Sequence, residues 1–312
     1  MDLSIVIPLL NEEESLPELA EWIHKVALKQ EWEYEILFID DGSNDNSWEV
    51  IKKLQSDAPG KVKGIRFQRN YGKSAALNVG FKAAKGRVVV TMDADLQDSP
   101  DELPELYRRI HEEKWDLISG WKKVRYDNKL SKNLPSKFFN SITRFFSKIK
   151  LNDFNCGLKA YDSEVVKTIE VYGEMHRYIP VLAKQAGFHK IGEQVVQHQA
   201  RKYGTSKFGW NRFINGFLDL MTLLFMHRYG KKPMHFFGLL GTLLFGFSFL
   251  VLIYLSIAKF TQADFTLTNK PSFYLMLTTL LLGSNLFLAG FIAETTVRNA
   301  RDRNKYLIRE EI

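Results

Sequence analysis

Two uncharged apolar segments near the C-terminal end constrain the fold of this chain most strongly. They cover 236–258 and 271–293, about 23 residues each. At a rise of 1.5 Å per residue, either segment is long enough to cross a hydrocarbon layer about 30 Å thick. Helices that are apolar on every side rarely occur next to each other in a soluble domain. We therefore predict two transmembrane helices within 231–298, with buried globular helices as the alternative.

Basic residues flank the two segments unevenly. Those outside the pair are Arg228, Lys231 and Lys232 before it and Arg298, Arg301, Arg303 and Lys305 after it. The short connection between the segments contains only Lys259 and Lys270 together with Asp264. The two apolar segments predict an integral protein of the inner (cytoplasmic) membrane, and the positive-inside rule predicts its orientation. Both termini, the N-terminal domain and a basic tail at 299–312 would lie in the cytoplasm.

The excess positive charge collects next to the predicted membrane segments. The 312 residues contain 43 Lys and Arg against 36 Asp and Glu, a net charge of +7, and 199–235 supplies most of it. Membrane lipids with anionic head groups or phosphate ligands are therefore the expected partners, and nucleic acid is not. Within this region, 207–230 has helical periodicity, which predicts an amphipathic interfacial helix. A core helix of the globular domain is the alternative.

The first two thirds of the chain alternate apolar strands with helical patterns. The predicted strands are 3–8, 34–39, 62–67, 87–91 and 116–119, and the predicted helices are 12–29, 44–55, 72–84 and 100–113. Continuous apolar strands alternating with helices indicate an α/β domain, here 1–206, with a mostly parallel sheet covered on both faces. Ligands of such sheets bind beyond the carboxyl ends of the strands.

Acidic side chains follow three of the predicted strands. Asp93 and Asp95 come directly after a buried strand, with Gln97 two residues further on. Oxygen ligands of this kind suit Mg²⁺ or Mn²⁺ shared with substrate phosphates. The pairs Asp40–Asp41 and Asn11–Glu12 follow two other strands, where ordinary turn chemistry explains them equally well. Since like charges gathered at one edge are costly without a cation or polar ligand, the three together predict a binding site.

Other site classes lack their signatures. The stretch 69–74 ends like a phosphate-binding loop, but Phe67 stands where the first glycine is required. No glycine-rich dinucleotide motif follows the first strand, and no nucleophile elbow of a hydrolase is present. The single cysteine, Cys156, excludes an internal disulfide and a cysteine-built metal site.

The ordered motifs of the chain resemble those of glycosyltransferase family 2. They are Ile5-Val6-Ile7-Pro8, Asn11-Glu12-Glu13, Asp40-Asp41-Gly42-Ser43, Asn70-Tyr71-Gly72-Lys73, Ala76-Leu77-Asn78, and Asp93-Ala94-Asp95-Leu96-Gln97-Asp98. Segments 153–159, 176–180 and 201–208 and the two C-terminal segments resemble, more narrowly, the polyprenyl-phosphate glycosyltransferases. That group contains dolichol-phosphate mannose synthase and bacterial bactoprenol glucosyltransferases. The resemblance covers essentially the whole chain.

The resemblance implies a GT-A fold and a metal-dependent, inverting transfer to a lipid phosphate. A hexose would pass from a nucleotide-sugar to an undecaprenyl-type or dolichyl-type phosphate for cell-envelope glycans. No side chain distinguishes one hexose or one nucleotide from another, and we favour a UDP-sugar over a GDP-sugar. The implied donor-binding residues are Pro8, Glu12, Asp41, Lys73 and Asp93. The implied Mg²⁺ or Mn²⁺ ligands are Asp93, Asp95 and Gln97.

The resemblance also suggests groups for the acceptor and the reacting phosphates. The catalytic candidates are Asp95, Asp153, Arg177, Arg201 and Lys207. The candidates for the acceptor phosphate are Lys122, Arg125, Arg201 and Lys207. Asp153 would orient the acceptor or act as a base, with a turn or a helix cap as the alternative. Lys122 departs from the arginine expected near this position, and lysine lacks bidentate phosphate geometry.

Two other functions compete with lipid-phosphate glycosylation. One is a membrane-anchored family member that glycosylates a glycan or a protein; a processive version of it would be expected to have a long acceptor groove and more spans. An inactive membrane scaffold would be expected to have lost Asp41, Asp93 or Asp95, and all three are present. Polar residues inside the spans, namely Ser248, Ser284 and Asn285, suggest contacts between subunits of a homo-oligomer.

Overall fold

The computed structural model describes residues 1–123, 140–145, 147–199, 202, 218, 221, 222, 225, 226, 228–230, 232–261 and 266–299. The chain divides into two compact units, Met1–Met221 and Thr222–Ile312. Each unit is described by itself.

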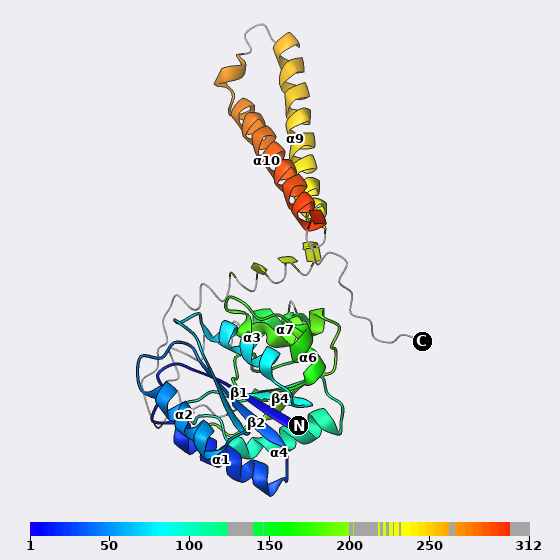
Figure 1. Ribbon diagram of the computed structural model, residues 1–312. Coiled ribbons are helices and arrows are strands. Elements are labelled where there is room, and N and C mark those ends of the chain that lie inside the picture. Colours follow the sequence, from blue (N-terminus) through cyan, green and yellow to red (C-terminus); the bar gives the residue numbers. More distant parts are fainter. Residues whose placement is uncertain are drawn as a thin grey trace. The chain divides into compact units, whose positions relative to one another are not determined.

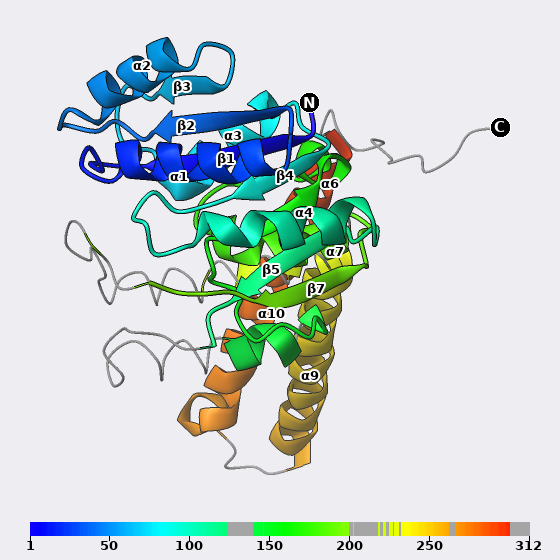
Figure 2. The same cartoon turned by 90° about the horizontal axis from the view of Figure 1, so that it is seen from below.

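The first unit is built on a seven-stranded sheet in the order β3-β2-β1-β4-β6-β5-β7 (Figure 2). The strands are β1 Leu3–Leu9, β2 Tyr34–Asp40, β3 Val62–Arg66, β4 Val88–Thr91, β5 Leu117–Trp121, β6 Lys159–Asp162 and β7 Ile191–Val195. Only β6 runs antiparallel to its two neighbours, β4 and β5. The predicted mostly parallel sheet is therefore confirmed.

Helices cover both faces of the sheet (Figure 1). One face is covered by α1 Leu16–Lys29, α2 Ser47–Asp57, and η1 Pro100–Glu102 with α4 Leu103–His111. The other face is covered by α3 Lys73–Ala83, α6 Ser163–Thr168, and η2 Met175–Tyr178 with α7 Ile179–Gln185. Every residue of β2 and β4 is buried, because the helices on both faces of the sheet shield its side chains from solvent.

The packing of α3 positions one wall of the site. A side chain at Gly80 would collide with Val6 of β1, so the glycine lets the helix lie directly on the sheet. Phe81, from the same helix, packs edge-on against Tyr161 of β6, with ring centroids 5.4 Å apart. Lys167 of α6 donates to the main-chain oxygens of Phe81, Lys82 and Ala84, which satisfies carbonyls at the end of α3.

Two helices begin later than the sequence pattern predicts. The first begins at Leu16 and not at residue 12, because Asn11 adopts a left-handed φ of 55° and the Glu12 N–H donates to Ser47 Oγ. The second begins at Ser47 and not at residue 44. The turns before both helices are thereby joined to each other. Strands β6 and β7 and the short helices after residue 158 were not predicted.

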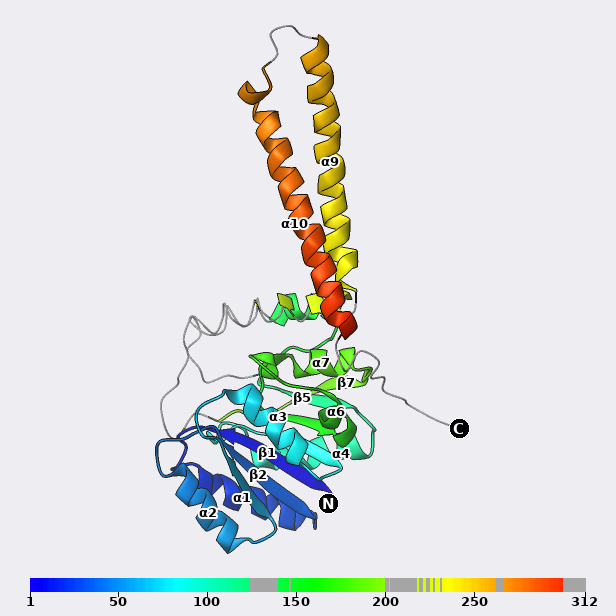
Figure 3. The same cartoon turned by 45° about the horizontal axis from the view of Figure 1, so that its top comes forward.

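The second unit contains a helical hairpin of α9 Pro233–Thr261 and α10 Pro271–Asn299 (Figure 3), with η3 Leu267–Asn269 just before α10. Both helices are long and apolar enough to cross a membrane, as predicted. They pack closely at Gly241, whose added Cβ would lie 2.8 Å from the oxygen of Gly283. Ser248 Oγ lies 2.7 Å from Thr279 Oγ1 across the hairpin. Small residues and paired hydroxyls are the usual contacts between helices in lipid.

The structure bears only partly on the polar residues of the spans, the interfacial helix and the C-terminal tail. Ser248 makes its side-chain contact within this hairpin, whereas Ser284 and Asn285 donate to carbonyls one turn earlier in α10. Most of the predicted interfacial helix at 207–230 and the whole tail from residue 300 lie outside the described residues.

Candidate active site

Three acidic strand ends lie next to one another at the carboxyl edge of the sheet. Strand β1 is the neighbour of both β2 and β4, and all three are parallel. Leu9 pairs with Asp40 in β2, and Val6 pairs with Thr91 in β4. The sequence-based expectation that these ends meet is therefore confirmed.

The segment after β4 contains two carboxylates, Asp93 and Asp95, between buried apolar residues. Met92, Ala94 and Leu96 are buried in the hydrophobic core, and Asp93 and Asp95 alternate with them in the sequence. Leu96 has a left-handed φ of 58°, which turns the chain sharply after Asp95. Because a side chain is strained in this region, the buried contacts of Leu96 must hold the turn.

Asp95 stabilises the turn that it begins. Its Oδ1 accepts the N–H of Gln97 at 3.2 Å, and its side chain is 8% exposed. The main-chain oxygen of Gln97 accepts the N–H of Gln199. The three predicted metal ligands, Asp93, Asp95 and Gln97, thus belong to one short loop that is fixed by its own hydrogen bonds.

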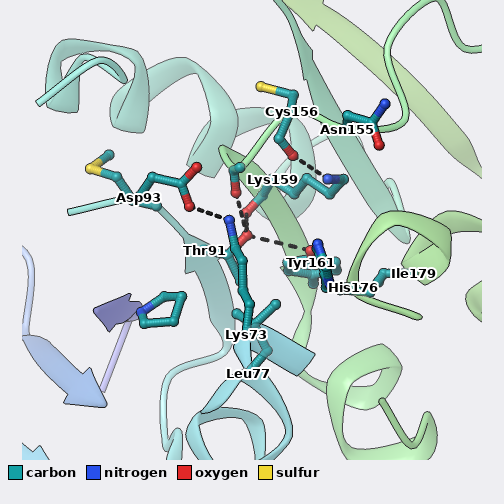
Figure 4. Close-up of a pocket in the computed structure, with 13 residues that line it drawn as sticks. Lys73, Leu77, Thr91, Asp93, Asn155, Cys156, Lys159, Tyr161, His176 and Ile179 are labelled. Atoms are coloured by element: carbon teal, nitrogen blue, oxygen red, sulfur yellow. Dashed lines mark hydrogen bonds and ion pairs between the residues drawn. The ribbon is translucent and has the colours of Figure 1, made fainter. Parts of the chain in front are cut away.

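The Asp93 carboxylate lies between a glycine and a lysine. A side chain at Gly157 would collide with it, so Gly157 leaves the space that the carboxylate fills. On its other side Asp93 forms an ion pair with Lys73, the first residue of α3 (Figure 4). Burial raises the pKa of Asp93, but the ammonium groups of Lys73, Lys122 and Lys159 outweigh it, so the pKa lies well below its ordinary value. Asp93 is therefore ionised at neutral pH.

The Asp40–Asp41 pair connects β2 to the loop 67–72. Both oxygens of Asp41 accept main-chain N–H groups, from Tyr71 at 2.7 Å and from Gly72 at 2.9 Å. Burial raises the pKa of Asp41 despite these two hydrogen bonds. Asp40 Oδ1 accepts the N–H of Ser43, as in an ordinary turn. The predicted nucleoside contact, Asp41, thus also fixes the backbone just before Lys73.

Gly42, which follows Asp41, lets the turn after β2 pack closely against the loop 67–72. Gly42 has a φ of 76°, and an added Cβ would lie 2.6 Å from the carbonyl carbon of Arg69. A cavity of about 360 Å³ opens between this turn and the end of β3, lined by Gly42, Ser43, Asn44, Arg66, Phe67 and Gln68. It lies beside Asp41, at the edge where an α/β sheet binds its ligand.

The remaining donor-side predictions occupy the end of β1. Pro8 lines a recess together with Lys73 and Asp93. Glu12 is partly buried, and both its main-chain oxygen and its Oε2 accept the hydroxyl of Ser15, at 3.0 and 3.3 Å. The structure therefore gathers Pro8, Lys73 and Asp93 around one recess and places Glu12 in the adjacent turn.

The acceptor-side predictions are more scattered. Asp153 is buried, and its Oδ1 accepts the N–H of Asn155 at 3.0 Å, so it does form the turn considered as its alternative role. Arg177 of η2 lies 3.8 Å from Glu174 Oε2. Arg125, Arg201 and Lys207 lie outside the described residues.

Lys122 is largely enclosed by the protein. Its Nζ lies 2.6 Å from Asp98 Oδ1, and the two side chains are 12% and 0% exposed. Burial alone would lower the pKa of Lys122, but the Asp98 carboxylate raises it well above its ordinary value. The charge of Lys122 is therefore balanced inside the fold.

Sequence reasoning gave no role to two residues that line the recess, Lys159 and His176, or to Asp98, the partner of Lys122. Lys159, at the start of β6, is 3% exposed and lines the recess. His176 also lines it, with Nδ1 3.1 Å from Ser74 Oγ, and Asp98 balances Lys122. All three residues belong to segments that resemble family motifs, but the resemblance assigned no role to them. No spacing rule connects residue 159 to residue 93, because an antiparallel strand brings them together.

The donor set fits a divalent cation that a substrate helps to bind. Asp93 and Asp95 supply hard carboxylate oxygens, and Asp93 remains ionised. Among the described residues, no group of three or more His, Cys, Asp or Glu side chains gathers closely enough to hold a metal alone. Magnesium sites that use one or two carboxylates, completed by substrate phosphates and water, have this composition.

Comparison with known proteins identifies the family of this chain. Residues 4–170 match the family model described as glycosyl transferase family 2. The chain belongs to glycosyl transferase family 2. The matched range contains β1 through α6 almost entirely, including the three acidic strand ends, and β7 lies beyond it.

Relatives of this family 2 chain match it along nearly its whole length. Dodecaprenyl-phosphate galacturonate synthase of Rhizobium johnstonii is 33% identical over 96% of this chain and 88% of its own. Undecaprenyl-phosphate 4-deoxy-4-formamido-L-arabinose transferase of Proteus mirabilis is 30% identical over 99% of this chain and 93% of its own. Both matches therefore include the C-terminal helices as well as the sheet.

Solved structures of this fold include glucosyl-3-phosphoglycerate synthase from Mycobacterium tuberculosis. Its complex with uridine diphosphate has a TM-score of 0.55 and 17% identity, and covers 72% of this chain and 79% of that one. A complex of the same protein that also contains Mn²⁺ and phosphoglyceric acid has a TM-score of 0.54. At this identity the likeness establishes the shared GT-A fold.

Proposed function

We propose that this family 2 glycosyltransferase transfers a sugar from a nucleotide-sugar to a polyprenyl phosphate. The full-length match to relatives named for this acceptor class, with both apolar helices included, is the observation that supports the acceptor most strongly. A soluble acceptor would not require two lipid-compatible helices. The two helices and these relatives make it a protein of the inner membrane.

The donor site proposed here lies along β2, β1 and β4. The cavity beside Asp41 would take the nucleoside, and the diphosphate would extend toward Lys73 and the loop of Asp93, Asp95 and Gln97. We favour UDP over GDP, because the solved structures with this fold include a UDP complex. The sugar would be a hexose.

The proposed transfer is a displacement at C1 of the sugar, with one acidic and several basic side chains in binding roles. An oxygen of the acceptor phosphate attacks C1 of the sugar, the bond from C1 to the diphosphate breaks, and the nucleoside diphosphate leaves with inversion at C1. The acceptor phosphate is already ionised near neutral pH, so a strong general base is not needed. Asp153 then orients the acceptor side, and Arg177, Arg201 and Lys207 supply positive charge for two anionic groups.

A divalent cation, Mg²⁺ or Mn²⁺, would supply electrostatic stabilisation of the leaving diphosphate. Asp93, Asp95 and Gln97 would hold it through side-chain oxygens. Lys73 is placed at the same carboxylate and adds a cation beside the leaving group.

The uneven distribution of basic residues supports a cytoplasmic site. Both termini and the catalytic domain would lie on the side of Arg228, Lys231 and Lys232, and the connection between α9 and α10 on the other. We place the catalytic domain at 1–206, the interfacial helix at 207–230 and the spans within 231–298. A homo-oligomer would form through contacts between the spans of different subunits.

A direct test uses the detergent-purified full chain with undecaprenyl phosphate and Mg²⁺ or Mn²⁺. The donors are UDP- and GDP-sugars that include hexoses, hexuronic acids and an amino-pentose, since the relatives differ in the sugar they are named for. Mass spectrometry of the organic extract should detect one glycosylated lipid phosphate. Donor hydrolysis without lipid product would instead favour a glycan or protein acceptor. Absence of nucleotide binding would favour an inactive scaffold.

A further inference from the structure

A small polar recess lies directly beside Asp93. It is lined on its polar side by Lys73, Thr91, Asp93, Lys159, Tyr161 and His176, and we call it the Lys159 recess (Figure 4). These residues come from α3, β4 and the loop after it, β6 and η2, so distant parts of the sequence form its walls. The cavity volume is about 10 Å³, close to the least that holds one water molecule.

Lys159 has fewer partners than its buried charge requires. Its side chain is 3% exposed, and among the described residues its one hydrogen bond goes to the main-chain oxygen of Cys156. An ammonium group has three donors and no acceptor. No carboxylate in the described part of the chain forms an ion pair with it, although Asp93 and Asp153 are near enough to affect it electrostatically. Burial lowers the pKa of Lys159, which reflects the cost of this charge.

The neighbouring charges are already balanced by one another. Asp93 pairs with Lys73, and Asp98 pairs with Lys122. Thr91 Oγ1 lies 2.8 Å from the main-chain oxygen of Gly157, so its proton is engaged as well. Lys159 is thus the cation at this recess that gains most from an additional anion, because a buried charge is costly unless it is paired.

The size and position of the recess limit what that anion can be. Room for about one water admits one oxygen at the tip of a flat group, and not a whole tetrahedral phosphate. Asp93 lines the recess and also belongs to the proposed metal-binding loop. The part of the donor beyond the diphosphate, namely the sugar, is therefore the part that can reach Lys159.

We propose that Lys159 binds a carboxylate on the donor sugar, so that the enzyme prefers a nucleotide-linked uronic acid over the corresponding neutral hexose. This inference rests on the proposed function, since it takes the donor site to lie beside Asp93. It goes further by narrowing the proposed hexose to its uronic acid form and by naming the residue that selects it.

The experiment measures donor binding to the detergent-purified full chain by calorimetry, without lipid acceptor. The ligands are UDP-galacturonate, UDP-galactose, the methyl ester of UDP-galacturonate, and UDP alone. The proteins are the wild type, Lys159→Met, Lys159→Arg, and Lys53→Met as a control on an exposed lysine of α2. Thermal unfolding verifies that each variant is folded.

The wild type should bind UDP-galacturonate about tenfold to a hundredfold more tightly than UDP-galactose, as expected for one charge-assisted hydrogen bond. Lys159→Met should abolish this ratio, Lys159→Arg should retain part of it, and Lys53→Met should retain all of it. In the wild type, the methyl ester should bind like the neutral sugar, which tests the inference without any substitution.

Two results would overturn the inference. One is a wild type that binds galacturonate, galactose and methyl-ester donors equally. The other is a Lys159→Met protein that weakens UDP alone by the same factor as UDP-galacturonate, which would mean that Lys159 acts on the diphosphate. Because binding is measured without the acceptor, failure to form a glycosylated lipid would count against the proposed function and leave the sugar preference measurable.

Discussion

The ε-ammonium of Lys73 forms an ion pair with the carboxylate of Asp93, the same carboxylate that is expected to bind the metal. Asp41 accepts the N–H groups of Tyr71 and Gly72, so it positions the residue that follows them. Asp41, at the end of β2, therefore helps to position Lys73 for its ion pair with Asp93, after the end of β4.

Replacing Lys73 should change metal binding and turnover in opposite directions. In Lys73→Met, Asp93 no longer has a competing cation, so Mn²⁺ should bind up to about fivefold more tightly, the equivalent of a partly exposed ion pair of about 1 kcal/mol. Turnover should nevertheless fall, because a cation beside the leaving diphosphate is lost. Mn²⁺ titration followed by electron paramagnetic resonance measures the first effect. Lys82→Met, on an exposed position of the same helix, is the control, and weaker Mn²⁺ binding in Lys73→Met would contradict the competition.

Asp95→Asn should remove most of the activity while leaving the protein folded. The amide can retain the hydrogen bond to the Gln97 N–H through its oxygen, but it lacks the charge that a divalent cation requires. We expect turnover to fall by about a hundredfold or more, as for the loss of one electrostatic contact to a transition state. Asp57→Asn, at an exposed position of α2, is the matched control. Near-normal rates of Asp95→Asn in Mg²⁺ would eliminate Asp95 as a ligand.

Lys122→Met should destabilise the fold through the carboxylate that it leaves behind. Asp98 is fully buried, and breaking a buried pair by removing one partner costs about 3–5 kcal/mol. The double variant Lys122→Met with Asp98→Leu should recover much of this loss, because no buried charge remains. Thermal unfolding of the detergent-purified full chain compares the three proteins. If Lys122→Met instead leaves stability unchanged and weakens polyprenyl-phosphate binding, Lys122 contacts the acceptor.

Glu35 should make stability depend on pH below 4.5. It is fully buried at the other end of the sheet, where it accepts hydrogen bonds from Ser4, Lys63 and the Lys85 N–H. Burial opposes its charge, but these partners outweigh burial and depress the pKa of Glu35 below its ordinary 4.5. Its stabilisation is therefore complete above pH 4.5 and is lost as the pH falls through the depressed value.

Glu35→Gln tests this pH dependence. The variant should be less stable than the wild type at neutral pH, and the difference should shrink on acidification. Unfolding temperatures measured across the acidic range make the comparison, with the exposed Glu49→Gln as the control. A constant difference at all pH values would show that Glu35 acts by its shape and not by its charge.

The sequence by itself determined the two apolar helices, five of the strands and the three acidic strand ends. These features depend on local periods and on residues that are adjacent in the chain. An uncharged run of 23 residues or a buried strand followed by Asp93 and Asp95 is visible without knowledge of distant contacts. The parallel direction of these strands then follows, because helices between strands act as crossover connections.

Only the tertiary structure decided which charges meet. Lys73 reaches Asp93, and Lys122 pairs with Asp98, through loops whose paths no local pattern specifies. Asp41 was expected at the nucleoside, and the fold also uses both its oxygens to hold the backbone before Lys73. Lys159 lies beside Thr91 because β6 runs antiparallel to β4. The physical reason is that pairing across a sheet joins residues far apart in sequence, so the partners of a buried charge are set by topology and not by spacing.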